Sequence, residues 1–375
     1  MEEWKEYKLG EVLTVKYGKD HKHIAEGDIP IYGSGGIMRF GEKSIYEGPS
    51  ILIPRKGSLN NIIFANKPFW TVDTMFWTMI NEEIANPLFV YYSICKKDFA
   101  SLNVGTAVPS LTVPVIEDID ILLPSKNKQD EIVTFLKSLD DKIELNKRIN
   151  DNLEQQAQAL FKHWFVDFGP FKNGEFVESE LGMIPKGWRV AKLGDIADLI
   201  KPSIKPEIGV VYNHYSIPAF DNNKIPSLDK GETIKSNKFA IQDSVIMLSK
   251  LNPDHKRIWY VDKIEANAVC STEFLPFYAK DREQSAFIYC YLNNRQIYRE
   301  IANGARGTTN SHQRIDANAI LSRDLAYNKD TISQFCNIVG AILKQQNHAV
   351  QESRRLATLR DTLLPRLMSG EISLE

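Results

Sequence analysis

The segment Trp4-Lys5-Glu6-Tyr7-Lys8-Leu9-Gly10-Glu11-Val12 decides the architecture. A close copy, Trp188-Arg189-Val190-Ala191-Lys192-Leu193-Gly194-Asp195-Ile196, occurs 184 positions later, and a long helical pattern also recurs after 203 positions. Solenoid units repeat every 20–50 residues or roughly so, and these periods are far longer. The chain is therefore a duplicated module of one globular domain and one long helix. Such a module suits a partner that presents two related surfaces, of which duplex DNA is the commonest.

Length and composition indicate an ordinary globular protein. With 375 residues, 43% of them hydrophobic and 25% charged, the chain is expected to form two domains. Its net charge of −2 is not the basic signature of a free-standing DNA-binding protein. It has no run of roughly 18 apolar residues and no signal peptide, and its four cysteines are far apart in sequence. We therefore expect a cytoplasmic protein with reduced thiols and no membrane partner.

Short β-type runs, separated by Gly, Pro and Asn, predict a mixed domain in each copy. In the first copy they are residues 29–32, 50–53, 61–64 and 76–79, and Asn86-Pro87 is expected to open a helix. In the second copy residues 244–247 correspond to 50–53, and 271–274 correspond to 73–76. We expect two similar, mostly antiparallel β-rich domains of the α+β class.

A seven-residue repeat predicts a long helix after the first domain. Residues from Lys128 to about Val166 include no Gly or Pro, so they can form a rod of roughly 55–60 Å. One set of repeat positions is Ile132, Leu139, Asn146, Leu153 and Leu160, and the set four residues on begins Leu136, Ile143, Asn150. Asn146 and Asn150 interrupt the apolar seam. They belong either to a solvated stretch or to a register-setting contact, and we favour the second interpretation.

A second helix is expected from about Thr331 to Leu364, where Pro365 should interrupt it. Its seam positions are Phe335, Ile342, Ala349, Leu356 and Leu363. Because the two helices share a phase, an antiparallel coiled coil would bury both seams and place the domains at opposite ends, related by a pseudo-twofold axis. The expected segments are 1–125 (domain 1), 126–168 (helix 1), 169–186 (linker), 187–329 (domain 2) and 330–375 (helix 2 and tail).

No catalytic motif is recognisable in the sequence. There is no phosphate-binding loop, no Pro-Pro tetrad of an amino-methyltransferase and no metal-ligand spacing. We therefore expect no catalytic or metal site and interpret the chain as a reader or scaffold.

Three segments carry a family resemblance: 142–168, ending in Phe161-Lys162-His163-Trp164-Phe165-Val166-Asp167-Phe168; 181–194; and 359–372, which includes Arg360-Asp361-Thr362-Leu363-Leu364-Pro365-Arg366. With them the chain resembles, over essentially its full length, a specificity (S) subunit of a type I restriction–modification system. The resemblance implies that each domain recognises one half of a bipartite, asymmetric DNA target. It also implies that the helices set the spacing and dock two modification subunits.

The partners and cofactors follow from the same resemblance. Modification subunits would methylate adenine with S-adenosylmethionine, and restriction subunits would cut DNA with ATP and Mg²⁺. This chain would need no cofactor of its own and would be a non-catalytic subunit. Partner subunits could also supply much of the phosphate-binding surface that its net charge of −2 lacks.

Candidate base-reading residues lie in turns beside the β-type runs and in the loops before each helix. Arg or Lys can bond guanine, Asn can bond adenine, and Lys or Ser can bond phosphate, although each is equally at home in a solvated loop. The candidates are Arg39, Arg55, Lys56, Ser58, Asn60, Asn61, Thr106, Ser110, Lys250, Asn252, Lys256, Arg257, Arg306, Thr308, Asn310, His312 and Arg314. The Arg306–Arg314 loop is the strongest of these, and its difference from the first copy predicts unlike half-sites.

Three other functional interpretations remain open from the sequence. An autonomous nuclease or methyltransferase would consume a substrate without partners. A coiled-coil assembly protein would bind only protein, and a DNA-recognition adaptor of another phage-defence system would share the same domain order.

Overall fold

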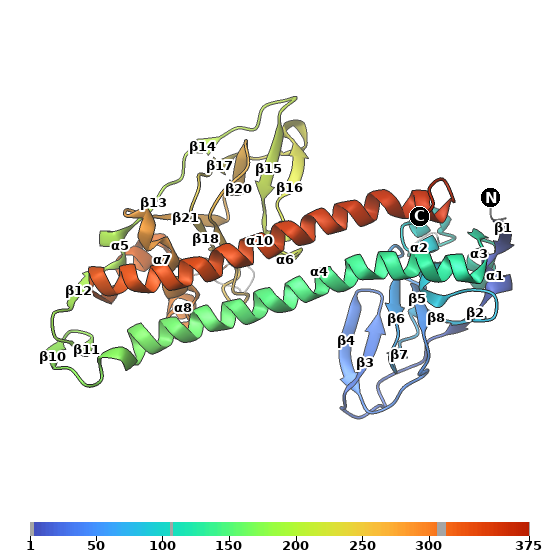
Figure 1. Ribbon diagram of the computed structural model, residues 1–375, viewed down its shortest axis with the longest axis horizontal. Coiled ribbons are helices and arrows are strands. Elements are labelled where there is room, and N and C mark those ends of the chain that lie inside the picture. The colour runs from blue at the N-terminus through green and yellow to red at the C-terminus, as the bar shows by residue number, and fades with distance from the viewer. Residues whose placement is uncertain (1–3, 106–107, 306–312, 375) are drawn as a thin grey trace. The chain divides into compact units, whose positions relative to one another are not determined.

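The computed structural model describes residues 4–105, 108–305 and 313–374, and the chain divides into two compact units (Figure 1). Unit 1 consists of Met1–Lys142 and Leu356–Glu375, and unit 2 consists of Ile143–Arg355. Each unit therefore combines one globular domain with parts of two long helices, α4 (Lys126–Phe161) and α10 (Lys329–Met368).

The globular domain of unit 1 is built on a four-stranded antiparallel sheet with the order β2-β8-β5-β6. A three-stranded sheet, β4-β3-β7, and the pair β1-β9 complete the strands. Their bounds are β1 Lys5–Lys8, β2 Leu13–Tyr17, β3 Ile29–Gly33, β4 Gly36–Gly41, β5 Ser50–Pro54, β6 Ile63–Ala65, β7 Trp70–Thr71, β8 Met75–Ile80 and β9 Asp120–Leu123. The short helices are α1 Leu9–Val12, α2 Pro87–Ile94 and α3 Val113–Glu117.

Unit 2 repeats this plan with additions. Its four-stranded sheet has the order β13-β21-β18-β19, and the second sheet has grown to β14-β17-β20-β15-β16. The strands are β10 Phe176–Ser179, β11 Gly182–Pro185, β12 Arg189–Lys192, β13 Ala197–Leu199, β14 Ser203–Ile204, β15 Val211–Tyr215, β16 Ser227–Lys230, β17 Lys238–Ala240, β18 Val245–Ser249, β19 Ile258–Val261, β20 Ala268–Ser271, β21 Phe274–Ala279 and β22 Asp324–Tyr327. The helices are α5 Leu193–Ile196, α6 Ile217–Asp221, α7 Ser285–Asn293, α8 Arg295–Asn303 and α9 Ala317–Leu321.

The strand pairings confirm the duplication and the mostly antiparallel prediction. Strand β5 lies between β8 and β6 as β18 lies between β21 and β19. The pairs β3–β7 and β15–β20 are parallel, and the other strand pairs of the described residues are antiparallel. The parallel strand pair thus occurs at the equivalent place in both domains, as expected for a duplicated domain.

The repeated segment that opens each copy forms the same strand-to-helix corner. The Leu9 amide donates to the Ile119 carbonyl at 2.8 Å, and the Leu193 amide donates to the Arg323 carbonyl at 2.9 Å. Both leucines are fully buried. A Cβ at Gly10 would lie 2.9 Å from the Glu117 Cβ, so the glycine lets this corner approach α3 closely.

The start of α2 was predicted correctly. Asn86 caps it, because its side-chain oxygen accepts hydrogen bonds from the amides of Leu88 and Phe89, and Pro87 occupies the first turn. The bonds from the Leu88 and Phe89 amides are 2.9 and 3.3 Å long, respectively.

Both long helices predicted from the sequence are present, with differences at their ends. Helix α4 continues as a π-helical turn, Lys162–Val166, which is wider than the expected α-helix. The prediction that Pro365 interrupts the second helix was wrong, because α10 continues to Met368. Leu364 and Leu367, on either side of the proline, are 3% and 0% exposed in the core of unit 1. Their burial offsets the hydrogen bond that Pro365 cannot donate.

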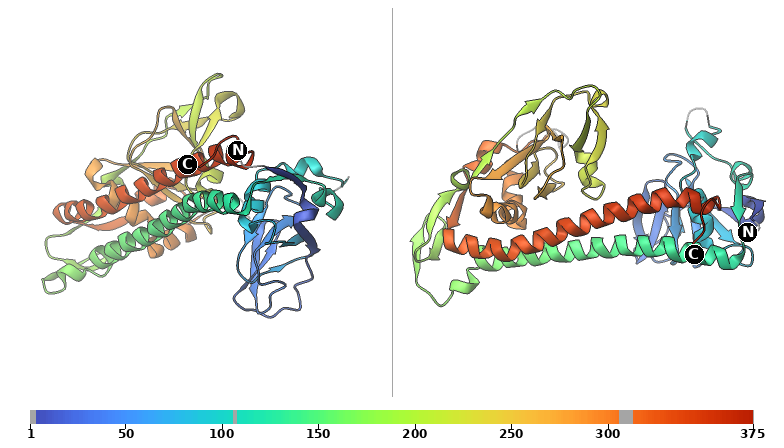
Figure 2. Two further views of the ribbon diagram at one scale, coloured as in Figure 1. Left: turned by 45° about the vertical axis from the view of Figure 1, so that its right-hand side comes forward. Right: turned by 45° about the horizontal axis from the view of Figure 1, so that its top comes forward.

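Helix pairing is antiparallel in each unit taken by itself. In unit 1 the first part of α4 packs against the last part of α10, with Leu136, Leu364 and Leu367 in one core. In unit 2 the last part of α4 packs against the first part of α10, with Phe161 and Phe335 in one core. The ribbons in Figures 1 and 2 show α4 in green and α10 in orange and red.

An aromatic cluster anchors the helices of unit 2 to its domain. The Phe165 ring lies 4.8 Å from that of Phe287 on α7 and 5.0 Å from that of Phe335 on α10. Trp188, from the repeated segment, lies 5.8 Å from Phe165. The π-helical turn places Phe165 in this core, which gives the 161–168 segment of the family resemblance a structural reason.

Candidate nucleic-acid interface and helix pairing

Two loops that are far apart in sequence meet in unit 1. The loop after β5 and the loop before α3 form a bridge between Lys56 and Ser110. The Gly57 amide donates to the Pro109 carbonyl at 3.3 Å, and the Leu111 amide donates to the Arg55 carbonyl at 2.9 Å. The structure thus brings together two groups of candidates that the sequence had only placed in separate turns.

Unit 2 has the equivalent junction. The loop after β18 and the loop before α9 form a bridge between Leu251 and Arg314. The Asn252 amide donates to the Gln313 carbonyl at 3.3 Å, and the Ile315 amide donates to the Lys250 carbonyl at 3.0 Å. Five candidates lie outside the described residues: Thr106, Arg306, Thr308, Asn310 and His312.

All four candidate arginines among the described residues have partners inside their own unit. The Arg55 guanidinium donates to the Asp73 carbonyl at 3.3 Å. The Arg39 guanidinium donates to the Ile24 carbonyl at 2.9 Å and to the His21 carbonyl, so it holds a loop in place. Arg257 makes two bonds to the Asp221 carboxylate, at 2.8 and 2.9 Å. These contacts favour a structural role for Arg39 and Arg257.

The Arg314 guanidinium lies 3.4 Å from the carboxylate of Glu273, the residue directly before β21. The partners Asp221 and Glu273 were not expected from the sequence, because each is more than 30 positions from its arginine. No local pattern could have identified them.

Other candidates keep polar groups at the surface. Lys56 and Ser58 are exposed, whereas Lys250 and Asn252 are half-buried. Lys256 is exposed, and its ammonium group donates to the Asn293 carbonyl at 3.0 Å. The base-reading roles of these residues stay predictions.

The remaining candidates of unit 1 make hydrogen bonds that connect the loop after β5 to neighbouring loops. Asn61 donates to the Ser34 carbonyl at 2.9 Å, and Asn60 donates to the Asp98 carboxylate at 3.1 Å. The Arg55 guanidinium lies 5.3 Å from the centre of the Tyr17 ring. Tyr17 is 54% exposed and is an addition to the candidate surface that the sequence analysis missed. Its signal was an aromatic residue at the end of a strand that the analysis had not assigned.

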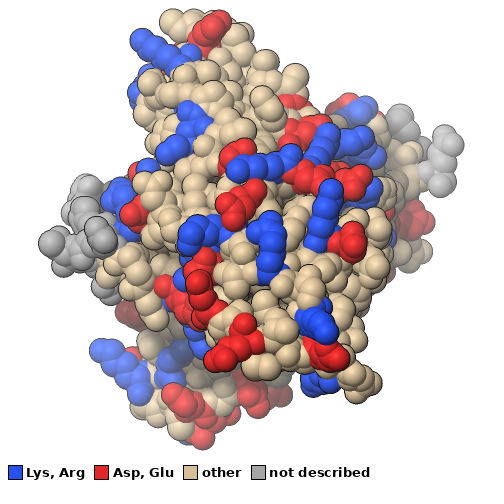
Figure 3. Space-filling view, turned by 90° about the vertical axis from the view of Figure 1, so that its left-hand side faces the viewer, with Lys and Arg blue, Asp and Glu red and all other residues tan. Residues whose placement is uncertain are grey.

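Charge on the visible face of the molecule is mixed. Lysines and arginines alternate with aspartates and glutamates in Figure 3. This agrees with the net charge of −2 and offers no extended basic surface on that face.

The polar middle of the seam is a contact between helices. Asn146 is 2% exposed, and its amide nitrogen donates to the Glu352 carboxylate at 2.7 Å and to the Ala349 carbonyl at 3.4 Å. Gln346 donates to the Asn150 carbonyl at 3.0 Å. Asn146 is therefore not in a solvated stretch but in a buried contact with α10, and its partner is a carboxylate rather than a second asparagine; its role in setting the register stays a prediction.

The apolar seam is buried along α4, but it is displaced by one residue in parts of α10. Ile132, Leu136, Leu139 and Leu153 are at most 8% exposed, and Ile143, Asn150 and Leu160 are half-buried. In α10 the expected seam residue Phe335 is buried. The expected seam residues Ile342 and Leu363 are only half-buried, and the residues that follow them, Leu343 and Leu364, are buried instead. Leu356 is also half-buried. The domain cores cover α10 from one side, which turns its buried stripe away from the strict seven-residue repeat.

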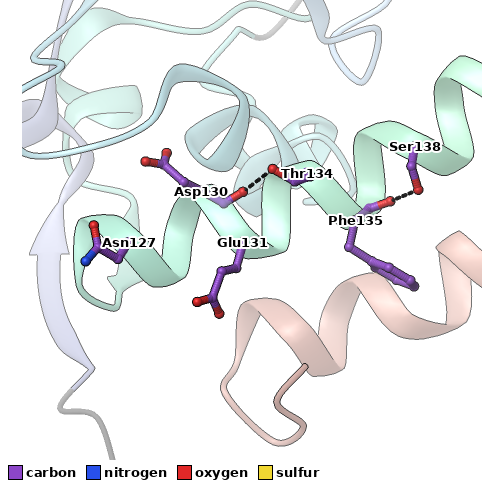
Figure 4. Close-up of a pocket in the computed structure, with 6 residues that line it drawn as sticks. All are labelled: Asn127, Asp130, Glu131, Thr134, Phe135 and Ser138. Atoms are coloured by element: carbon purple, nitrogen blue, oxygen red, sulfur yellow. Dashed lines mark hydrogen bonds between the residues drawn. The ribbon is translucent and has the colours of Figure 1, made fainter. Parts of the chain in front are cut away.

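A surface hollow follows the first turns of α4 in unit 1. Its lining residues are Asn127, Asp130, Glu131, Thr134, Phe135 and Ser138 (Figure 4). The hydroxyls of Thr134 and Ser138 are bonded to α4 carbonyls. The Glu131 carboxylate forms an ion pair with Lys128 at 2.9 Å, and the Asp130 carboxylate accepts a hydrogen bond from the Asn86 side-chain amide at 2.7 Å. Both carboxylates of the hollow therefore have partners within unit 1.

The described residues contain neither a membrane-spanning candidate nor a metal-ligand cluster. No helix there is long and apolar enough to cross a membrane, and no group of three His, Cys, Asp or Glu side chains could hold an ion. Burial raises the pKa of Cys270 and of Cys336 to about 12, so both thiols stay protonated.

Comparison with known proteins connects this geometry to one family. Residues 1–155 match the family model described as "Type I restriction modification DNA specificity domain". The chain is 29% identical to the type I restriction enzyme MjaIX specificity subunit of Methanocaldococcus jannaschii, over 92% of this chain and 84% of that protein. It is 25% identical to the HindI specificity subunit of Haemophilus influenzae, over 99% and 100% of the two chains. The crystal structure of a type I S subunit from M. genitalium shares the fold, with a TM-score of 0.60, 16% identity, and coverage of 98% of this chain and 96% of that one.

Proposed function

We propose that the chain is a specificity subunit of a type I restriction–modification system, and that each of its domains reads one half of a bipartite DNA target. The duplicated loop junction supports this proposal most directly. The Lys56–Ser110 and Leu251–Arg314 bridges occupy the same place in two copies of one fold. A common frame with different loop side chains is what two unlike half-sites require.

The two helices set the distance between the half-sites. Helix α4 has 36 residues and α10 has 40, so each can span about 54–60 Å as a rod. At about 3.4 Å for each base step, a rod of this length covers some 16–18 base pairs end to end. Domains that lean inward would bring the centres of the half-sites to roughly 10–15 base pairs apart, subject to groove access every 10.5 base pairs or so.

The helices also dock the modification subunits. The surface hollow on α4, where Asp130 is hydrogen-bonded to Asn86 and Glu131 is paired with Lys128, offers polar groups and the half-buried Phe135 ring to a protein partner. Two modification subunits would then bring the adenine methyltransferase chemistry and S-adenosylmethionine. Restriction subunits would bring ATP-dependent cleavage with Mg²⁺, and this chain would supply recognition without catalysis in the cytoplasm.

The test is target selection from random duplex DNA by the chain assembled with its modification subunits. We expect the selected molecules to share two short, different sequences separated by a constant unspecified gap. Selection of one continuous sequence would contradict bipartite recognition. Absence of DNA binding by the assembled complex would favour a coiled-coil assembly protein instead.

A further inference from the structure

Each unit contains a junction where a tyrosine of the globular domain, a carboxylate of α4 and a long side chain of α10 meet. Clasp 1, in unit 1, consists of Tyr92, Asp140 and Arg360. Clasp 2, in unit 2, consists of Tyr289, Asn293, Glu154 and Gln346.

In clasp 1 the Asp140 carboxylate accepts two hydrogen bonds from different elements. The Tyr92 hydroxyl on α2 donates to Oδ2 at 2.5 Å, and the Arg360 guanidinium on α10 donates to Oδ1 at 2.5 Å. The Arg360 side chain is 25% exposed and that of Asp140 is 34% exposed, so the pair is partly shielded from water. Charge-assisted bonds of this length are short and directional.

In clasp 2 the Glu154 carboxylate accepts hydrogen bonds from two residues that lie one turn apart on α7. The Tyr289 hydroxyl donates to Oε2 at 2.6 Å, and the Asn293 amide donates to Oε1 at 2.5 Å. The Gln346 amide on α10 adds a longer bond to Oε2 at 3.4 Å. Tyr289 and Asn293 are 3% and 7% exposed, so this contact is sheltered inside unit 2.

The two carboxylates are spaced by two heptads in α4, and the two α10 donors are also spaced by two heptads. The duplication does not explain them. The positions 203 residues after Asp140 and Glu154 hold Leu343 and Ala357, which cannot act as acceptors. The clasps are therefore additions to the copied scaffold, and both place the acid on α4.

Each tyrosine ring is fixed in its domain. Tyr92 is 5% exposed and packs in the core of unit 1, and Tyr289 packs in the core of unit 2. Burial, with the nearby Asp140 or Glu154 carboxylate, raises the pKa of both hydroxyls, so they remain donors across the physiological range. Because each ring is fixed in its domain and its hydroxyl is bonded to α4, the domain cannot rotate relative to α4 without breaking that hydrogen bond.

We propose that Asp140 and Glu154 are positioning residues that set the rotational orientation of each globular domain around the helix pair, and thereby the gap of the DNA target. The inference rests on the proposed bipartite recognition. Each base pair added to the gap advances a half-site by about 3.4 Å and rotates it by roughly 34°. A domain held at one angle accepts one gap, whereas a domain that has lost its clasp is held by its apolar core alone and tolerates a neighbouring gap.

The experiment uses the full chain assembled with its modification subunits. Three single variants weaken the clasps with little change in volume: Tyr92→Phe, Tyr289→Phe and Glu154→Gln. The matched control is Glu144→Gln, which neutralises an exposed carboxylate on the same helix. Methylation rates are measured on duplexes that keep both half-sites and vary the gap by one base pair in each direction.

The wild-type complex should methylate a duplex with its own gap roughly tenfold faster than a duplex whose gap is one base pair longer or shorter. This is the scale of the loss caused by one mismatched base pair. The clasp variants should reduce that preference by about threefold or more and leave the preferred bases unchanged, whereas Glu144→Gln should match wild type. Clasp variants with the full wild-type preference would overturn this inference alone. A wild-type complex that methylates all gaps equally would instead refute the spacing role of the helices.

Folding is checked by the thermal unfolding temperature of each variant. If Glu154→Gln fails to fold, Tyr289→Phe tests the same clasp, because it retains the buried ring and removes only the hydroxyl. A variant that is stable and fully selective for the gap counts against the proposal.

Discussion

Lengthening both helices by one heptad should lengthen the unspecified gap of the DNA target. The insertion duplicates residues 143–149 in α4 and 346–352 in α10, the two stretches that contain Asn146 and its partners Ala349 and Glu352. Seven helical residues add about 10.5 Å, and this equals about three base pairs of DNA. The seven-residue period preserves the phase of the seam, and the insertion lies between Asp140 and Glu154, so both clasps keep their residues.

The assay is methylation mapping with the lengthened chain and its modification subunits. The account predicts the same bases at both ends of the target and a gap longer by about three base pairs. A control chain with the heptad inserted in α4 alone should assemble poorly, because its seam positions no longer match those of α10. An unchanged gap, or altered end bases with the old gap, would show that the helices do not measure the distance.

Three further perturbations test separate parts of the structure. Deleting residues 331–375 removes nearly all of α10, including Leu364 and Leu367 of the core of unit 1, and should destabilise domain 1 and abolish assembly with modification subunits; full methylation by the truncated monomer with its partners would contradict the role of the helices. Phe335→Ala should lower the free energy of unfolding by about 3–5 kcal/mol, because this 1%-exposed ring fills the aromatic core, and a chemical denaturation curve near wild type would contradict that packing. Arg39→Ala should lower the free energy of unfolding by about 1–3 kcal/mol. Lys56→Ala should instead weaken DNA binding and reduce the number of ions released on binding by about one. Weaker DNA binding for Arg39→Ala together with lower stability for Lys56→Ala would contradict the roles given to the two residues.

The duplicated plan could be predicted because its signals are local and occur twice. The glycine of each Lys-Leu-Gly corner, the Asn86-Pro87 helix start and the seven-residue repeat are all visible within short windows. The continuation of α10 past Pro365 could not be predicted in this way. It depends on burial of Leu364 and Leu367 by residues of domain 1 that are hundreds of positions away.

The candidate site was predictable only as loops. The sequence identified the turns after β5 and β18 and the loops before α3 and α9, but it could not show that they form paired junctions. It also could not distinguish Arg257, which is bound to Asp221, from the exposed Lys56. Pairings between distant residues depend on the tertiary fold and leave no mark in the local pattern. The clasps escaped prediction for the same reason, since 48 positions separate Tyr92 from Asp140.

The most direct test of the account is an exchange of one domain. Residues 197–323 would be replaced with the equivalent domain of a relative that has a different target, and methylated adenines would be mapped genome-wide with the parent and hybrid chains. The account predicts that one half-site changes to that of the relative, while the other half-site and the gap stay the same. A change in both half-sites, or in neither, would contradict the claim that each domain reads its own half of the target.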